Sequence, residues 1–115
     1  IAAVSNQAFA LPRLSLNDVA ALAHKAKGAV CSDTGLAHLA AVAGLPAQTI
    51  YGSTATQLIG TVGENQHHIV SDLSCAPCYK RTCPKPEAIN REPVCMAEIS
   101  AETVWHRLDG LLQAQ

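Results

Sequence analysis

The sequence predicts an α/β fold: a Rossmann-like parallel sheet flanked by helices. Short apolar segments of strand length alternate with longer segments in which apolar residues recur at helical spacing. Because a helix separates the predicted strands, strand–helix–strand units of this length are read as parallel crossover connections. The chain has 115 residues, 49% of them apolar, which is enough for one packed core.

The first predicted helix covers residues 16–27. Ser15 is a good N-cap, and apolar residues recur on one helical face after it. Gly28 ends this helix, because glycine is common just beyond a helical C-terminus. The segment 29–32, with the sequence AVCS, is expected to be a short buried strand.

A second helix and a second strand follow directly. Asp33 is expected to be the N-cap of a helix over 34–43, which Gly44 ends. The segment 47–52, AQTIYG, then predicts the next strand of the sheet.

The second half of the chain contains fewer regular elements. Residues 67–71 predict a last short strand, and 72–98 form a cysteine-rich, proline-bearing loop. The segment 100–113 predicts a C-terminal helix: Ser100 is its cap, and leucines at helical spacing form its buried stripe.

Composition excludes several classes of partner and site. Charged residues make up 15% of the chain and the net charge is −1, so a basic nucleic-acid-binding face is not expected. No apolar run reaches the roughly 18 residues of a membrane span. Four of the five cysteines are confined to one loop of a core-rich chain, which favours a reducing compartment over a secreted disulfide framework. The abrupt start at Ile1 suggests a fragment.

The corner Ser32-Asp33-Thr34-Gly35 is the first candidate binding site. It lies at the carboxyl end of a predicted parallel strand, where α/β sheets bind ligands. The first helical amides near Thr34 and Gly35 have no intrahelical partner, so they favour an anion, and His38 follows one turn later. Asp33 would repel a bare phosphate but suits a ligand with both phosphate and hydroxyl groups, such as a nucleotide sugar. The alternative is that Asp33 only caps the helix.

A set of ordered motifs resembles the C-terminal domain of the bacterial lipopolysaccharide heptosyltransferases, glycosyltransferase family 9. The matching segments are LP-x-LSL at 11–16, S-x-DTG-x-x-H at 32–38, AA-x-x-G-x-P at 40–46, YG-x-T at 51–54 and LIG…G-x-NQ at 58–66. The last segment is most similar to members that add the first heptose to the Kdo of the inner core.

This resemblance implies that residues 1–115 are a partial C-terminal nucleotide-sugar-binding domain of a GT-B glycosyltransferase. It implies an ADP-heptose donor with its diphosphate at Thr34 and Gly35. Asp33 would lie near the heptose hydroxyls with His38 close by, and Leu14 near the adenine. An acidic catalytic base belongs to the family's N-terminal half, so no catalytic residue is expected in this chain, which alone would be inactive.

The reaction implied is an inverting transfer to the lipopolysaccharide inner core, with Kdo–lipid A or a heptosylated core as acceptor. The family's location implies the cytoplasm, at the cytoplasmic face of the inner membrane. No cofactor or metal is implied for the transfer step itself.

The cysteine-rich loop is a second candidate site. Cys75, Cys78, Cys83 and Cys95 have the spacing C-x2-C-x4-C-x11-C, which leaves three alternatives open: a structural zinc site, one or two disulfides, or free thiols. Between them Lys80, Arg81, Lys85 and Arg91 outnumber two glutamates, which suits an anionic acceptor or a peripheral membrane contact.

Two other functions compete with the heptosyltransferase interpretation. One is another nucleotide-sugar enzyme of the GT-B fold, which donor preference between ADP and UDP sugars would separate. The other is a zinc-stabilised binding module without catalytic activity, in which Asp33 would only cap a helix.

Overall fold

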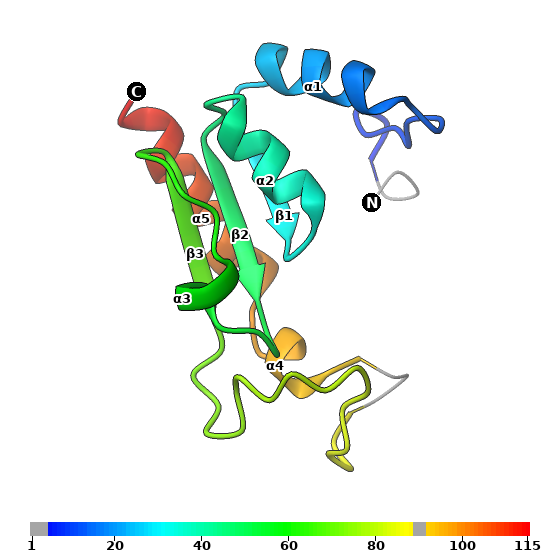
Figure 1. Cartoon of the computed structure of the whole chain (residues 1–115), viewed down its shortest axis with the longest axis vertical. Coiled ribbons are helices and arrows are strands. Elements are labelled where there is room, and N and C mark those ends of the chain that lie inside the picture. The colour runs from blue at the N-terminus through cyan, green and yellow to red at the C-terminus, as the bar shows by residue number, and fades with distance from the viewer. Residues whose placement is uncertain (1–4, 89–91) are drawn as a thin grey trace.

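Three parallel strands form the sheet in the part of the chain that the structure describes, in the order β1-β2-β3. The structure is a computed structural model that describes residues 5–88 and 92–115. The strands are β1 (Ala29–Ser32), β2 (Ala47–Tyr51) and β3 (Gln66–Val70). Ala29 pairs with Ala47, and Ala47 with Gln66, so all three strands run in the same direction (Figure 1). The predicted parallel α/β architecture is confirmed.

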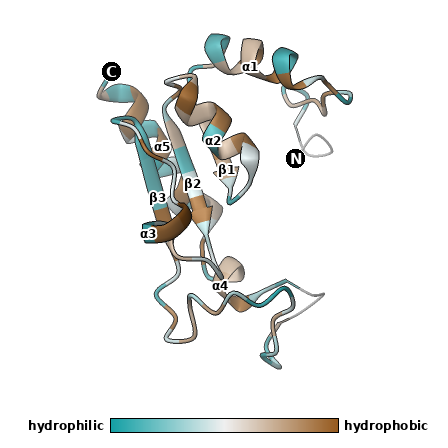
Figure 2. Cartoon of the chain, in the orientation of Figure 1, coloured by the Kyte–Doolittle hydropathy of each residue, from teal (hydrophilic) through white to brown (hydrophobic). Residues whose placement is uncertain are grey.

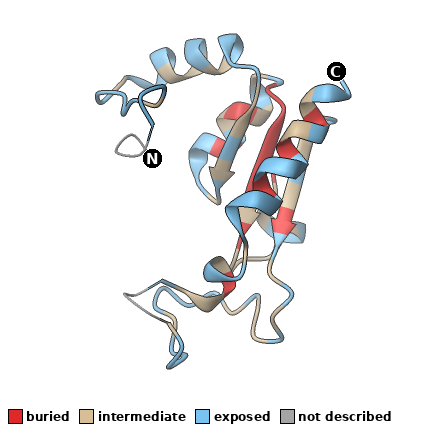
Figure 3. Ribbon diagram, turned by 180° about the vertical axis from the view of Figure 1, so that it is seen from behind, coloured by how far each residue is buried: buried red, intermediate tan, exposed pale blue. Residues whose placement is uncertain are grey.

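Helices cover both faces of the sheet. Helix α2 (Gly35–Val42) contacts β1 and β2 on one face, and α5 (Ala101–Gln113) contacts the same two strands from the other. Figure 1 shows α2 in front of the sheet, and the reverse view in Figure 3 shows α5 in front. The remaining helices are α1 (Leu16–Lys25), α3 (Thr56–Ile59) and α4 (Val94–Ala97).

The core lies where the two covering helices meet the sheet. On the α2 side, Ala40, Leu45 and Ala47 form a buried cluster. Helix α5 buries Val104, Leu108 and Leu111, the stripe expected from their spacing. Figure 3 shows this buried set in red along β2 and one side of α5.

Gly28 lets α5 pack closely beside the start of β1. A Cβ at this position would lie 2.9 Å from Leu112 Cδ2 and 3.2 Å from Leu108 Cδ1. The glycine therefore makes room for the last helix, but it does not end α1 as predicted: the helix stops at Lys25, and Ala26 is its C-cap.

Two expectations about burial and capping are wrong. Strand β1 alternates between half-buried and exposed residues and is not fully buried: Ala29 and Cys31 pack against the core on one face, whereas Val30, on the other face, is exposed. Thr34, not Asp33, occupies the N-cap position of helix α2 without a side-chain capping hydrogen bond, and Asp33 accepts its hydrogen bond from Thr54. The cysteine-rich segment 72–98 is a loop as far as Pro93 in its described part and then forms the short helix α4.

Apolar side chains also remain on the surface. Leu36 and Val42 of α2 are exposed, and so is Leu58 of α3. Figure 2 colours α3 as strongly apolar. In the described parts of the chain, 5–88 and 92–115, we find no helix with the length and apolar character needed to cross a membrane.

Candidate functional site

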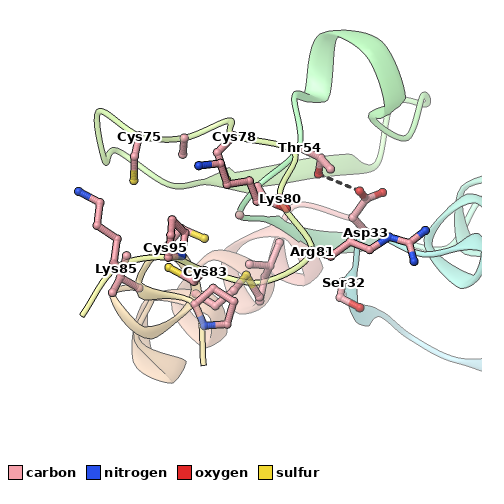
Figure 4. A pocket seen from close by; sticks show the side chains of 18 residues that line it. Ser32, Asp33, Thr54, Cys75, Cys78, Lys80, Arg81, Cys83, Lys85 and Cys95 are labelled. Carbon is pink, nitrogen blue, oxygen red and sulfur yellow. Dashed lines mark hydrogen bonds between the residues drawn. The ribbon is translucent and has the colours of Figure 1, made fainter. Parts of the chain in front are cut away.

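Asp33 lies at the carboxyl end of β1 and binds the neighbouring connection of the sheet. Its Oδ2 accepts a hydrogen bond of 2.8 Å from the hydroxyl of Thr54, which follows β2 (Figure 4). Neighbouring parallel strands end at the same edge of a sheet, so Thr54 competes for the carboxylate that was expected to cap α2. Asp33 thus ties two strand ends together, and its second oxygen has no partner among the described residues' hydrogen bonds.

The first turn of α2 is open to solvent. Thr34, Gly35 and His38 are exposed. The Thr34 side chain makes no capping hydrogen bond, and a Cβ added to Gly35 would meet no atom within 4 Å. The first amides of this helix have no intrahelical acceptor, so they are free to face a ligand. Leu14 is half-buried in the segment that precedes α1.

A cavity of about 460 Å³ opens on the other side of Asp33 (Figure 4). Four parts of the chain meet there: the end of β1, the end of β2 with its connection, the cysteine-rich segment, and α4. Its lining residues are Ser32, Asp33, Ile50, Gly52, Ser53, Thr54, Cys75, Ala76, Cys78, Lys80, Arg81, Cys83, Pro84, Lys85, Pro93, Val94, Cys95 and Met96. Of the donor-binding residues predicted from sequence, the cavity includes Asp33 and none of Leu14, Thr34, Gly35 or His38.

Tyr79 fixes the cysteine-rich segment against the sheet edge. Its backbone N–H donates to the carbonyl of Ser53 at 2.8 Å, and its phenol oxygen accepts the N–H of Ala55 at 3.1 Å. Tyr79 has φ +56°, a left-handed conformation that costs a residue with a side chain roughly 1–2 kcal/mol. The two hydrogen bonds offset this cost and place Cys78 and Lys80 at the cavity.

Gly52 allows α4 to close the cavity floor. A Cβ at Gly52 would lie 2.8 Å from Cys95 Sγ and 2.9 Å from Met96 Sδ. A larger residue here would force the side chains of Cys95 and Met96 to shift. The glycine of the YG-x-T motif therefore makes room for α4 at this site.

All five cysteines are unlinked, and four of them line the cavity. Hydrogen bonds from the backbone of Val94 and Lys85 lower the pKa of the Cys83 thiol. Burial raises the pKa of Cys95, and the neighbouring cysteines raise it further. Burial likewise raises the pKa of Cys31 in β1.

The predicted metal ligands thus share one cavity, but their geometry does not form a metal site in this conformation. No three Cys, His, Asp or Glu side chains within 5–88 and 92–115 are arranged to hold an ion. The fit of Cys75, Cys78, Cys83 and Cys95 to zinc stays a prediction from their spacing. Arg91, counted above with the basic residues of this segment, lies outside the described residues.

The sequence patterns did not indicate that Thr54 and Tyr79 help to form this site. Thr54 is the last position of the YG-x-T motif, so the motif contained a usable signal for it. Tyr79 lies within the cysteine-rich segment, and nothing in the local pattern indicates that its partners are Ser53 and Ala55.

Comparison with known proteins matches this chain to one family. The family model described as glycosyltransferase family 9 (heptosyltransferase) matches residues 2–89. Lipopolysaccharide heptosyltransferase 1 of Pseudomonas aeruginosa is 36% identical over 123 aligned residues, which cover 99% of this chain and 35% of that protein.

Enterobacterial relatives match a shorter part. The proteins named lipopolysaccharide heptosyltransferase 1 in Salmonella typhimurium and Escherichia coli K12 are 50% and 48% identical over 56 residues, about half of this chain and 18% of each relative. The chain therefore spans about a third, or less, of the length of these relatives. No solved structure matches it.

Proposed function

This chain belongs to glycosyltransferase family 9, the heptosyltransferases, and from that premise we propose that it forms the donor-binding part of a lipopolysaccharide heptosyltransferase. The family model matches well over half of the chain, including the Asp33 corner. The observation that carries the proposal is the open first turn of α2 at the carboxyl edge of a parallel sheet.

The proposed donor is ADP-heptose. Its diphosphate meets the free amides near Gly35, where the missing Cβ lets an oxygen approach the backbone. The Thr34 hydroxyl and His38 lie on the same exposed turn. The unpaired oxygen of Asp33 accepts a hydroxyl of the sugar, and Leu14 contacts the adenine.

The proposed reaction is an inverting transfer to the inner core of lipopolysaccharide. A base outside this chain takes the proton of the acceptor hydroxyl, whose oxygen attacks the anomeric carbon as the bond to ADP breaks. This chain contributes by stabilising the charge that develops on the leaving diphosphate, through amides fixed at the helix N-terminus. The acceptor is Kdo–lipid A or a heptosylated core, which places the reaction at the cytoplasmic face of the inner membrane.

Calorimetric titration of ADP and UDP into the full-length protein tests the donor site. Gly35→Val is expected to weaken ADP binding by about tenfold or more, because its branched side chain covers the amides that hold the diphosphate. Gly110→Val is the matched control: Gly110 is also helical, and a Cβ there also meets no atom within 4 Å.

Equal ADP affinity in the wild type and both variants would contradict the assignment of the diphosphate to α2. Preference for UDP over ADP would contradict the proposed donor and favour another nucleotide-sugar enzyme of this fold.

A further inference from the structure

Four thiols that are spread over 21 positions of the chain face one cavity (Figure 4). Cys75, Cys78 and Cys83 lie in the loop part of the cysteine-rich segment, and Cys95 lies in α4. Cys95 is the buried member, and a Cβ at Gly52 would lie 2.8 Å from its Sγ. Burial and then the charges of the other three cysteines raise the pKa of Cys95. Each of the three therefore lies close enough to Cys95 to act on its thiolate.

Backbone hydrogen bonds join Cys83 to the neighbourhood of Cys95. The sulfur of Cys83 accepts hydrogen bonds from the backbone of Val94 and Lys85, and Val94 directly precedes Cys95. Hydrogen bonds of this kind stabilise the thiolate, which is the form of cysteine that binds a metal. Two of the four thiols thus lie near each other, and one of them is already favoured in its anionic form.

The charges around the thiols suit an anionic metal centre. Four thiolates around Zn²⁺ leave two negative charges uncompensated. Lys80 and Lys85 line the same cavity, and neither forms a salt bridge within residues 5–88 and 92–115. The charge of Lys85 acts on Cys83 in addition to the stronger effect of the two hydrogen bonds that lower its pKa. Arg81 lies beside Asp33 at one end of the cavity in Figure 4 and is left out of this comparison of charges.

We propose that Cys75, Cys78, Cys83 and Cys95 together bind one structural zinc ion. The C-x2-C spacing of Cys75 and Cys78 is typical of a pair of zinc ligands, and Cys83 and Cys95 complete the tetrahedron. All four positions are then held by the protein, so the ion has no open position for a substrate and no catalytic role. The zinc site does not depend on the proposed transferase function.

Zinc binding requires the four thiols to converge. In the part of the chain that the structure describes, no three of these side chains are arranged to hold a metal. Zinc–sulfur bonds are about 2.3 Å long, whereas the cavity has a volume of about 460 Å³. The described part of the loop that carries Cys75, Cys78 and Cys83 contains no helix or strand, so it moves without breaking regular structure. Zinc is therefore expected to draw this loop onto α4 and to fix it beside the ends of β1 and β2.

Zinc affinity of the full-length protein, purified under reducing conditions, tests the proposal. Cys83→Ser removes one ligand. Cys31→Ser is the matched control, because Cys31 is also half-buried but lies in β1 and does not line the cavity. In competition with a chelator, wild type and C31S are expected to bind zinc equally well. C83S is expected to bind it at least about 100-fold more weakly.

Cobalt(II) in place of zinc gives a second measurement. Tetrahedral coordination by four thiolates gives strong visible absorption and a thiolate-to-cobalt charge-transfer band, which is expected to weaken in C83S. Zinc is also expected to protect the four thiols from iodoacetamide, which reacts with them once a chelator has removed the ion.

Three outcomes overturn the proposal: no zinc bound by the reduced wild type, equal zinc affinity in wild type and C83S, or equal losses in C83S and C31S. Isolation of the wild type with these cysteines linked as disulfides and without zinc also counts against it. If C83S unfolds, the cobalt spectrum of the wild type decides, and absence of the charge-transfer band of four thiolates overturns the proposal. None of these outcomes bears on the donor proposal, because ADP binding is measured separately.

Discussion

The phenol oxygens of Tyr51 and Tyr79 accept backbone N–H groups at the same distance in different surroundings. Tyr51 is buried and accepts from Thr61, whereas Tyr79 is half-exposed and accepts from Ala55, both at 3.1 Å. Tyr51→Phe is expected to lower the free energy of unfolding by about 1–3 kcal/mol, because the buried N–H loses its partner. Tyr79→Phe is expected to cost about 0.5 kcal/mol, since water replaces the lost hydroxyl.

Urea unfolding of the two variants measures this difference. Equal losses of stability would mean that water reaches Thr61 as readily as Ala55, which would contradict the burial of Tyr51.

The two cysteines with opposite pKa shifts are expected to differ in reactivity. The thiolate form of cysteine is the nucleophile. Hydrogen bonds from the backbone lower the pKa of the Cys83 thiol, so this residue stays ionised to a lower pH than an ordinary cysteine. Burial has the opposite effect on Cys95 and also limits access to it. Iodoacetamide at neutral pH is therefore expected to label Cys83 first and Cys95 last, as followed by mass spectrometry of the peptides.

The pH dependence of this labelling has a defined sign. As the pH falls from about 9 to 7, the labelling rate of Cys95 should drop more steeply than that of Cys83, because a thiol with a lowered pKa loses less of its thiolate. Labelling of Cys95 before Cys83 at any pH in this range would contradict the assigned environments.

At the level of elements, helices α1 and α5 have the same cap but different packing. Ser15 and Ser100 each accept the N–H of the third residue that follows, at 3.2 and 3.1 Å. Helix α1 buries no side chain, whereas α5 buries three. Ser100→Ala is therefore expected to lower the free energy of global unfolding by about 1 kcal/mol. Ser15→Ala is expected to fray α1 without changing the free energy of global unfolding.

Hydrogen exchange combined with thermal unfolding measures both effects. Equal shifts of the unfolding midpoint for Ser15→Ala and Ser100→Ala would show that α1 unfolds together with the core, which contradicts its lack of buried residues.

The elements also show what the sequence could and could not predict. Strand 29–32 and the caps Ser15 and Ser100 agree with prediction, because apolar patterning and capping depend on residues next to one another. The role of Asp33 was mispredicted because its partner, Thr54, is 21 residues away and is brought near only when the strands align. The contact of Tyr79 with Ala55 spans 24 residues and has no local signal.

At the level of the whole molecule, the cysteine-rich segment is attached to the sheet by few contacts. Tyr79 holds it at Ser53 and Ala55, and Glu98 contacts Ser71 and the N–H of Asp72 at its base. Within this segment, trypsin is therefore expected to cut first after Lys80 or Arg81, which are exposed and lie outside helices and strands. The two fragments should stay associated, because α5 packs on β1 and β2.

Limited digestion followed by gel filtration and mass spectrometry measures this order. A first cut within α1 or α5, or separation of the fragments under native conditions, would contradict the expected distribution of stability. Cleavage after Lys85 does not compete, because trypsin cuts poorly before proline and Pro86 follows this lysine.

The packing of α5 against the start of β1 has a consequence for biosynthesis. The helix that closes one face of the sheet is completed roughly 60 residues after β2 is synthesised, which corresponds to about 3–12 s at usual elongation rates. During that interval the face of β1 and β2 that α5 covers has no helix to bury it. A nascent chain in this state exposes apolar strands to chaperones and to other nascent chains, so the timing of translation bears on the yield of folded protein.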